Sequence, residues 1–420
     1  MAGTYQSGSN EEIVWAEVTN ETDLVPAANG IVIPHAGNPG TPSPRFNRSA
    51  SDVVVSDGQV IDNTATGYTV PMTASAPIAY GQYDRPITSL MGNDWTAGVD
   101  IQVAGATATA ASNSIQGAIN EFTALATQVP CLVYVRTASA GNTAGFNDKM
   151  VLALQVTNGG GNTDDTLVFG NATNGGAAIV DDGAAAWRIF HSGRVNNGTD
   201  CRFGIIERRQ TSISRFYHGF GTLATQLDFS HVKGQEPTWA MTFASYLANH
   251  ATATVVPTLD PTPTYGAFNA GGNFGEFREN GTELAGILVR QNNFTYSAAA
   301  SPVEVSGNDG PSGHTRGRFT ASGNLIVIAA QAADGMQNRV LNDLPSSLQW
   351  WNRRTETVAG NPVDVAYGHW IPSIQYDSHE FQNGGNDNTV ENSYPWNARK
   401  SPDYGITAQI VRFENIPTTV

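Results

Sequence analysis

The chain has few charged residues and few cysteines for its length. Only 14% of its 420 residues are Asp, Glu, Lys or Arg, and Cys131 and Cys201 are its two cysteines. Two thiols without a CxxC partner cannot build a disulfide framework, so we expect small buried hydrophobic thiols in a chain made in a reducing cytoplasm. No run of eighteen apolar residues occurs, which argues against a membrane-spanning helix.

Basic residues are scarcer than acidic ones. The chain has 22 Lys and Arg against 37 Asp and Glu, for a formal net charge of −15. This excess of acidic residues argues against a protein that binds nucleic acid through a basic face. It is compatible with a solubilising surface, and equally with an acidic channel past which DNA slides.

Abundant Gly, Asn, Ser and Thr predict a mainly β chain with many turns. The clearest pattern lies in residues 202–247, where apolar and polar residues alternate in three successive runs. Leu227 and Phe229 share one face of the second run, and residues 233–235 (KGQ) form a turn before the third. A period of two is typical of strands with one buried face, so this stretch predicts an antiparallel meander.

The composition changes at about residue 97 and changes back at about residue 187. We therefore predict a small inserted α+β or β domain over 97–187, within a discontinuous main domain formed by 1–96 and 188–420. Helices are expected over 85–95, 113–129 and 334–342. Residues 1–30 are expected to form a mobile arm or leading strand. Residues 251–277 and 377–403 are expected to form long loops, and no internal repeat of fixed period is visible.

No catalytic residue, cofactor site or metal site is predicted. Residues 219–224 match a dinucleotide-binding spacing, but a strand pattern follows where that motif needs a helix. The eight histidines lack ligand spacing, and the acidic pairs at 164–165 and 181–182 lack the closing carboxylate of a calcium loop. A pair of glycosidase carboxylates among the 37 acids is left open by spacing alone.

Tryptophan-rich segments occur at 348–351 (LQWW), 367–370 (YGHW) and 393–396 (SYPW). Such segments can form a sugar-binding platform, but more often they fill a core or a subunit interface. We favour the core or interface interpretation.

Four segments, in order along the chain, resemble motifs of siphophage major tail tube proteins. They are 44–60 (PRFNRSASDVVVSDGQV), 90–95 (LMGNDW), 202–247 and 284–296 (LAGILVRQNNFTY). The resemblance implies a β-sandwich or barrel with a short helix, assembled as six copies per ring. It also implies that the rings stack into a virion tail tube around a tape measure protein. Tail terminator and distal tail proteins would bind its ends, and double-stranded DNA would pass through the bore.

The resemblance also implies where contacts lie. Polar residues of the two motif strands are candidates for bore or ring contacts: Gln226, Asp228, Ser230, Arg290 and Asn292. The segments 1–30 and 251–277 would cross between rings, and the 97–187 domain would lie outside the tube. Two rival functions remain open: a lectin-like receptor-binding or capsid-decoration protein, and a carbohydrate-active enzyme.

Overall fold

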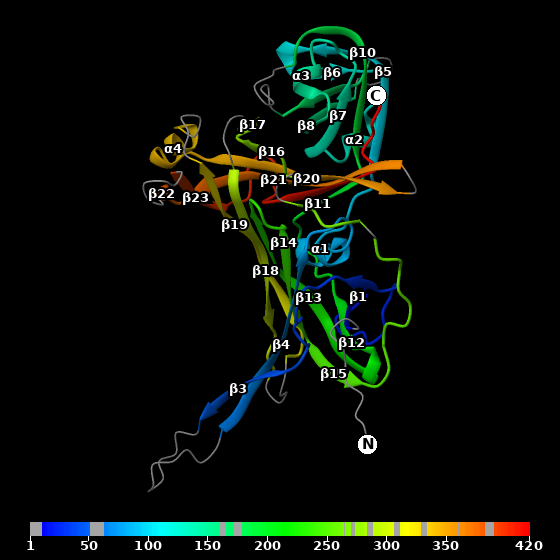
Figure 1. Cartoon of the computed structure of the whole chain (residues 1–420), viewed down its shortest axis with the longest axis vertical. Coiled ribbons are helices and arrows are strands. Elements are labelled where there is room, and N and C mark those ends of the chain that lie inside the picture. The colour runs from blue at the N-terminus through cyan, green and yellow to red at the C-terminus, as the bar shows by residue number, and fades with distance from the viewer. Residues whose placement is uncertain are drawn as a thin grey trace.

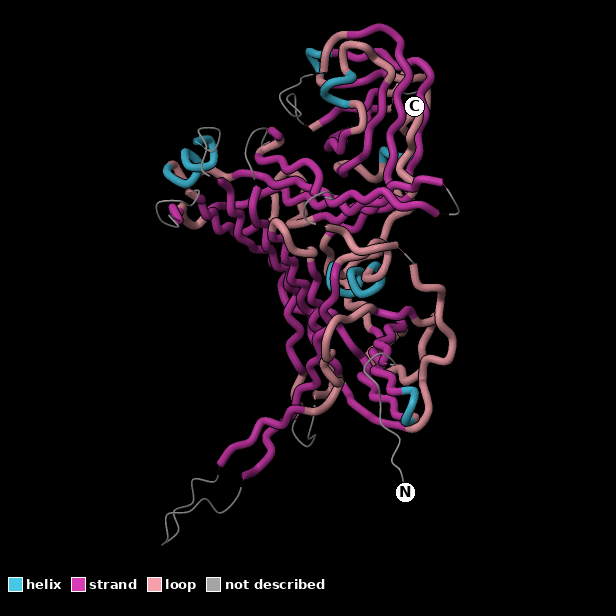
Figure 2. Tube along the Cα trace, viewed as in Figure 1, coloured by secondary structure: helices cyan, strands magenta, loops and turns pink. Residues whose placement is uncertain are grey.

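The computed structural model is mainly β, with three parts that Figures 1 and 2 show from one side. A closed barrel lies at one end, a large antiparallel sheet system forms the middle, and a two-stranded hairpin projects at the other end (Figure 1). The structure describes residues 11–50, 63–158, 164–170, 179–263, 265–269, 274–283, 289–305, 311–328, 334–358, 361–382 and 390–420.

The sheet system consists of two units that follow one another along the chain. The first unit contains β1 (Glu11–Glu17), β2 (Ile31–Ile33), β3 (Arg45–Ala50), β4 (Asn63–Pro77), α1 (Asp84–Met91), β11 (Gly193–Asn196), β12 (Gly204–Gln210), β13 (Arg215–Val232), β14 (Thr238–Ser245) and β15 (Leu247–Ala251). The second unit contains β16 (Phe274–Glu279), β17 (Thr282–Glu283), β18 (Val289–Pro302), β19 (His314–Ile328), α4 (Asp334–Leu341), β20 (Ser346–Val358), β21 (Asn361–Tyr376), β22 (Glu380–Gln382), β23 (Glu391–Ala398) and β24 (Gln409–Glu414).

The two units repeat one pattern of antiparallel strand pairing. In the first unit the pairs are β1–β2, β1–β12, β3–β4, β12–β13, β13–β14, β13–β15 and β4–β14. In the second they are β16–β17, β16–β20, β18–β19, β20–β21, β21–β23, β21–β24 and β19–β23, in the same order. In each unit a short helix follows the hairpin. The chain therefore contains a repeat of strand pairing, although its sequence shows no repeat of fixed period.

The strand pair β13–β18 joins the two units into a continuous sheet, and β11 of the first unit also pairs with β24 of the second. β13 of the first unit pairs antiparallel with β18 of the second, from Gln226↔Ser297 to Val232↔Gln291. On the buried side of this pair Phe229 stacks on Phe294, with ring centroids 4.5 Å apart. Both rings belong to the main hydrophobic core, which extends through both units. The two units are therefore one packed body.

The barrel is formed within the span 99–191. It closes β5 (Val99–Thr109), β6 (Ser114–Gln116), β7 (Cys131–Thr137), β8 (Lys149–Thr157), β9 (Thr166–Phe169) and β10 (Asp182–His191) around a separate core. Two short helices, α2 (Thr123–Ala126) and α3 (Thr143–Phe146), accompany these strands. Its outer residues Tyr134 and Met150 pack with Trp351 and Phe413, so the barrel covers one face of β20, β21 and β24.

The expected helix over 113–129 was wrong. Residues 114–116 instead form β6, which pairs with β5 and β9 and buries Ile115 in the barrel core. Asn113 and Asn120 have φ of 50° and 64°, in the left-handed region that a continuous helix does not allow. The apolar spacing matched a helical face, but only the four residues of α2 use it.

Two expected loops or arms are partly strands. Residues 391–398, within the segment expected to be a surface loop, form β23 between β19 and β21, with Tyr394 and Trp396 buried. Residues 11–17, within the segment expected to form a mobile arm or leading strand, form β1 between β2 and β12 and bury Trp15 completely, which confirms the strand alternative there. In both cases long-range pairing and aromatic burial override a polar local sequence.

The other main elements agree with the sequence. The meander is confirmed as β12, β13 and β14, with Gly234 at φ 86° in the turn. The short helices are confirmed as α1 and α4. Cys131 is buried as expected, whereas Cys201 is exposed. The Asp57-Gly58 turn signal lies outside the described residues.

Candidate functional site

A polar face runs across β4, β14, β13, β18 and β19, opposite the core. Alternation puts apolar residues such as Leu227 and Phe229 inward and their neighbours outward. We call the outward set the polar sheet face: Thr73, Ser75, Gln226, Asp228, Ser230, Thr238, Thr242, Asn293, Thr295, Ser297, Ser322 and Asn324. Asp228 is the one charged residue of this set, so the face is nearly neutral and rich in small side chains.

Three of the predicted contact residues lie together on this face. Gln226 Nε2 donates to both carboxylate oxygens of Asp228, at 2.9 and 2.8 Å. Thr295 Oγ1 donates to Asp228 at 2.6 Å, and Ser230 Oγ donates to Asn293 at 3.3 Å. These bonds join β13 to β18 across the junction of the two units. They also leave Asp228 satisfied by neutral donors.

The other two predicted residues lie elsewhere. Asn292 points to the core side of β18 and is fully buried, so its assignment to a surface contact was wrong. Asn292 keeps the regular alternation of β18, two residues before the buried Phe294, so its inward position follows from the period of two. Arg290 lies in a bulge at the start of the strand, between Val289 and Gln291, and forms an ion pair with Glu391 of β23.

The tryptophan segments belong to the interior. Trp350, Trp351, Trp370 and Trp396 are all at most 3% exposed. Trp350 packs in the main core, and Trp351 and Trp370 pack between the second unit and the barrel. The core interpretation of these segments is confirmed. They offer no flat aromatic surface to a sugar.

The described ranges contain neither a cluster of metal ligands nor a membrane-spanning helix. No group of three His, Cys, Asp or Glu side chains that could hold a metal ion occurs there. Nor does any helix in that part of the chain have the length and apolar character needed to cross a membrane. His369, next to one tryptophan segment, is fully buried among the aromatic rings of the core.

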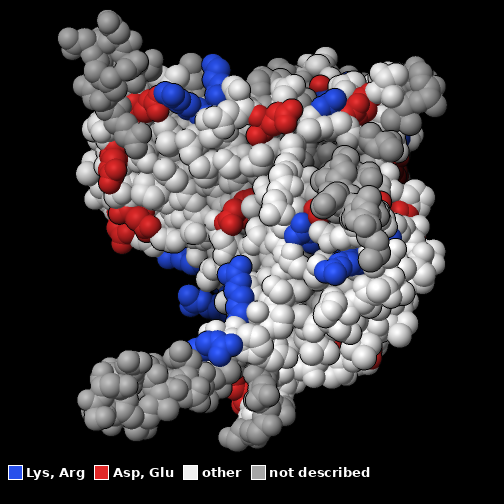
Figure 3. Space-filling model, turned by 60° about the horizontal axis from the view of Figure 1, so that its bottom comes forward, with Lys and Arg blue, Asp and Glu red and all other residues white. Residues whose placement is uncertain are grey.

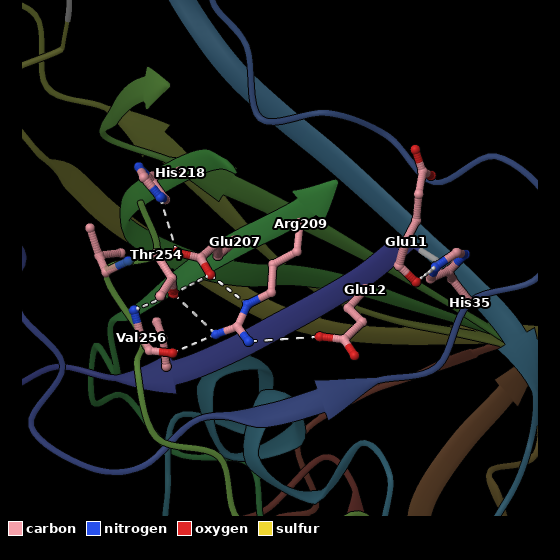
Figure 4. A network of polar contacts seen from close by, with 9 residues as sticks. Glu11, Glu12, His35, Glu207, Arg209, His218, Thr254 and Val256 are labelled. Atoms are coloured by element: carbon pink, nitrogen blue, oxygen red, sulfur yellow. Dashed lines mark hydrogen bonds and ion pairs between the residues drawn. The ribbon is translucent and has the colours of Figure 1, made fainter. Parts of the chain in front are cut away.

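A buried charged network holds the segment after β15 against the first unit (Figure 4). Glu207 on β12 is completely buried and accepts hydrogen bonds from Thr254 Oγ1 at 2.7 Å and the Val255 amide at 2.8 Å. Arg209 Nε donates to its Oε1 at 2.6 Å, and His218 Nε2 lies 3.0 Å from its Oε2. Arg209 also donates to the Val256 carbonyl and so spans β12 and the loop.

This network changes the interpretation of residues 251–277. Downstream of it, the Gly30 amide donates to the Thr258 carbonyl at 2.9 Å, and the Asp260 amide donates to the Gly30 carbonyl at 2.8 Å. Arg85 of α1 forms an ion pair with Asp260. The described part of the loop is therefore docked on its own chain. The expectation of a free inter-ring arm here was wrong for 252–260.

Replacing Glu207 with Gln is expected to lower the free energy of unfolding by about 3 kcal/mol, because it leaves the buried Arg209 charge without its partner. Burial alone would raise the pKa of Glu207, but hydrogen bonds from His218, Thr254 and Val255 and the charge of Arg209 lower it below its usual value. A lowered folded-state pKa stabilises the protein above the ordinary carboxyl pKa, and this contribution is lost as pH falls.

Chemical denaturation at pH 7 and pH 4 measures both effects. The matched control is Glu12→Gln, because the Glu12 side chain is 44% exposed and lies 3.7 Å from Arg209. We expect that control to change stability by less than about 0.5 kcal/mol. Equal losses in the two variants would contradict the role given to Glu207.

The two units leave unpaired strand edges at opposite ends of the joined sheet. In the first unit β3 pairs with β4, and among the described strands none pairs with its other edge. In the second unit β22 pairs with β23, and its other edge is equally open within the described chain. Phe381, in the middle of β22, is 62% exposed. An exposed edge with an apolar side chain is a site where another strand can add.

The hairpin β3–β4 extends the first of these edges away from the body (Figure 1). Phe46 on β3 is half exposed and packs edge-on against Tyr68, with centroids 5.6 Å apart. Figure 3 shows this end of the molecule: most of the visible surface is uncharged, and basic side chains gather in the notch beside the hairpin. The polar sheet face and these two edges are the candidate functional surfaces.

Sequence reasoning found the polar sheet face but not the edges. Phe381 lies in the motif His-Glu-Phe-Gln at 379–382, which parallels Leu-Asp-Phe-Ser at 227–230. Comparing those two segments could have revealed both the repeat and the second edge. Among protein-family models none matches this chain, and a search of curated proteins also finds no match.

Proposed function

We propose that the protein is a structural virion protein that forms the stacked rings of a bacteriophage tail tube. One observation carries this proposal: two like units are already joined edge to edge, and strand edges are left open at the two ends of the joined sheet, within the described chain. A contact that uses different surfaces on its two sides is heterologous and closes into a ring when the rotation allows. A closed ring of sheets removes exposed edges that would otherwise promote aggregation.

The polar sheet face supports a bore through which DNA moves. The named residues of this face, small neutral side chains and Asp228, cannot pair with phosphate and release counterions, and Arg318 lies further along β19. DNA in such a channel is repelled weakly and bound nowhere. The projecting β3–β4 hairpin, rather than the loop after β15, is the element available to reach a neighbouring ring.

Electron microscopy of the purified full-length protein tests this function directly. We expect rings at low concentration and hollow tubes of constant width at high concentration. Uniform monomers under all conditions, including the presence of a tape measure segment and tail terminator protein, would contradict it. Enzymatic release of sugars from glycans would favour the rival carbohydrate-active function instead.

A positive charge placed on the polar sheet face should make the bore bind DNA. We expect Ser230→Lys tubes to retain double-stranded DNA that wild-type tubes release, because each ring would then present several cations to phosphates. The measurement is co-sedimentation of short DNA with preformed tubes at 50 to 300 mM salt. Ser230→Gln, of similar size but neutral, is the control. DNA retention that is equal in both variants would place this face outside the bore.

A further inference from the structure

The junction between the two units is a template for the contact between chains. At β13–β18 the buried Phe229 stacks on Phe294, and Thr295 bonds Asp228 on the other side of the sheet. The helix α1 lies over the same junction and contacts both strands. Arg316 of β19 donates to the Ser89 and Leu90 carbonyls at the end of that helix. Among the described strands the second unit forms no counterpart of the β13–β18 pairing.

The surfaces that the first unit uses at this junction have counterparts in the second unit. In the second unit these counterparts are exposed. β14 pairs with β4 in the same register in which β23 pairs with β19. Residues 224–230 lie beside β14, and residues 376–382 lie at the equivalent positions beside β23. The two segments therefore correspond residue by residue, without a gap. Asp228, Phe229 and Ser230 thus correspond to Glu380, Phe381 and Gln382. Phe229 is 2% exposed, whereas Phe381 is 62% exposed.

The helices differ in the same way. α1 (DRPITSLM) and α4 (DGMQNRVL) have equal length, so Met91 corresponds to Leu341. Met91 is fully buried, whereas Leu341 is 72% exposed and Leu344 beyond it is 47% exposed. Three large apolar side chains therefore lie uncovered around the outer edge of the second unit. A unit packed there as the second packs on the first would cover them.

The partner surface lies in the first unit. The segment that corresponds to β18 consists of residues 36–44, which lie outside any strand, and of β3. The Ala36 amide donates to Ser75 and the Gly40 amide to Thr73, so this stretch runs along β4 as β18 runs along β19. Extending the Arg45↔Thr69 register by two residues places Ser43 opposite Pro71. In the second unit the counterpart of Pro71 is Ser322, and Ser322 pairs with Thr295. Ser43 therefore corresponds to Thr295.

We propose that β22 of one copy pairs with residues 36–50 of the next copy, repeating the β13–β18 contact between chains, so that a ring of six units contains three chains. The proposal rests on the tail tube function, and it replaces the six copies that the family resemblance implies. The occupant of the edge is a second copy of this chain, because the chain itself displays the same contact already formed. Three chains with two units each give the pseudo-sixfold ring.

Symmetry and cross-linking test the proposal. Class averages of rings viewed end-on should show three barrels and threefold symmetry. Glu380→Cys combined with Ser43→Cys, in a Cys201→Ser background that removes the exposed thiol, should form a disulfide between copies on oxidation. Denaturing gels should then show species up to trimer and none larger. Each single-cysteine variant, with one partner missing, should remain monomeric on the gel.

A point variant separates assembly from folding. Phe381→Asp should abolish rings while leaving the thermal unfolding midpoint unchanged, because Phe381 is already exposed in the single chain. The matched control is Ile119→Asp, an apolar residue of similar exposure (46%) on the barrel, which should assemble normally. Rings with six chains, or threefold rings without the disulfide, would overturn the proposal but preserve the tube. The absence of any ring or tube from the wild-type protein would overturn both.

Discussion

Replacing Phe294 with alanine is expected to lower the free energy of unfolding by about 3–5 kcal/mol, the usual cost of removing a buried aromatic ring. Phe294 lies where the two units meet: its ring centroid is 4.5 Å from that of Phe229 and 5.0 Å from that of Trp350. The cavity cannot close easily, because strand pairing on both sides fixes the surrounding rings. Guanidinium denaturation followed by tryptophan fluorescence measures the loss.

The control for this prediction is Phe381→Ala, which removes an equally large ring from a solvent-exposed site. For the unassembled chain we expect that change to fall within about 0.5 kcal/mol of wild type. A loss below about 1 kcal/mol for Phe294→Ala would mean that the two units do not depend on each other for their stability.

Acid should destabilise the protein from about pH 6.5 downward, and His369→Phe should remove much of this effect. Burial lowers the pKa of His369 to about 3, because its ring is enclosed by the aromatic side chains of the core. The unfolded chain takes up the proton near pH 6.5 and the folded chain does not until about pH 3. The unfolded state is therefore favoured by about 1.4 kcal/mol for each pH unit between these values.

The measurement is the denaturation midpoint at several pH values from 7 to 4 for wild type and His369→Phe. The variant loses the contact between His369 Nδ1 and the Tyr296 hydroxyl, 3.3 Å apart, so its stability at pH 7 should be slightly lower. An effect of similar size and the same sign should remain down to about pH 4, because burial also lowers the pKa of His191 to about 4. Parallel pH profiles for the two proteins would refute the assignment to His369.

Much of the fold could be predicted because alternation is a local signal. The strand β13 and its neighbours carry apolar residues at every second position, and burial then decides which face is inward. The strand β23 could not be predicted in this way, because Pro395 and several polar residues interrupt the alternation of its sequence. Its position is determined by pairing with β19 and β21. The helix wrongly predicted at 113–129 is the opposite kind of error, a regular pattern without the element. Apolar residues there have a helical spacing, but this spacing does not indicate which residues adopt a left-handed backbone conformation.

The same rule of alternation decides which candidate contact residues could be placed from the sequence. Asp228 and Ser230 could be placed on a polar face from the sequence, because their neighbours are clearly apolar. Asn292 could have been placed inward by the same rule, because it lies two residues before Phe294 and four before Tyr296 on β18. The repeat was hidden because the pairing pattern recurs while the side chains do not, and because the barrel separates equivalent strands by different lengths of chain.

The barrel interrupts only one of the two units, and this has a consequence for the outside of any assembly. A protein made of identical single units must decorate every position or none. Here the duplicated chain can place an appendage at alternate positions, with a bare unit between each pair. Such spacing would leave room for the appendage to enlarge or diverge in sequence without crowding its neighbours, while the undecorated unit would keep the wall of the proposed tube continuous.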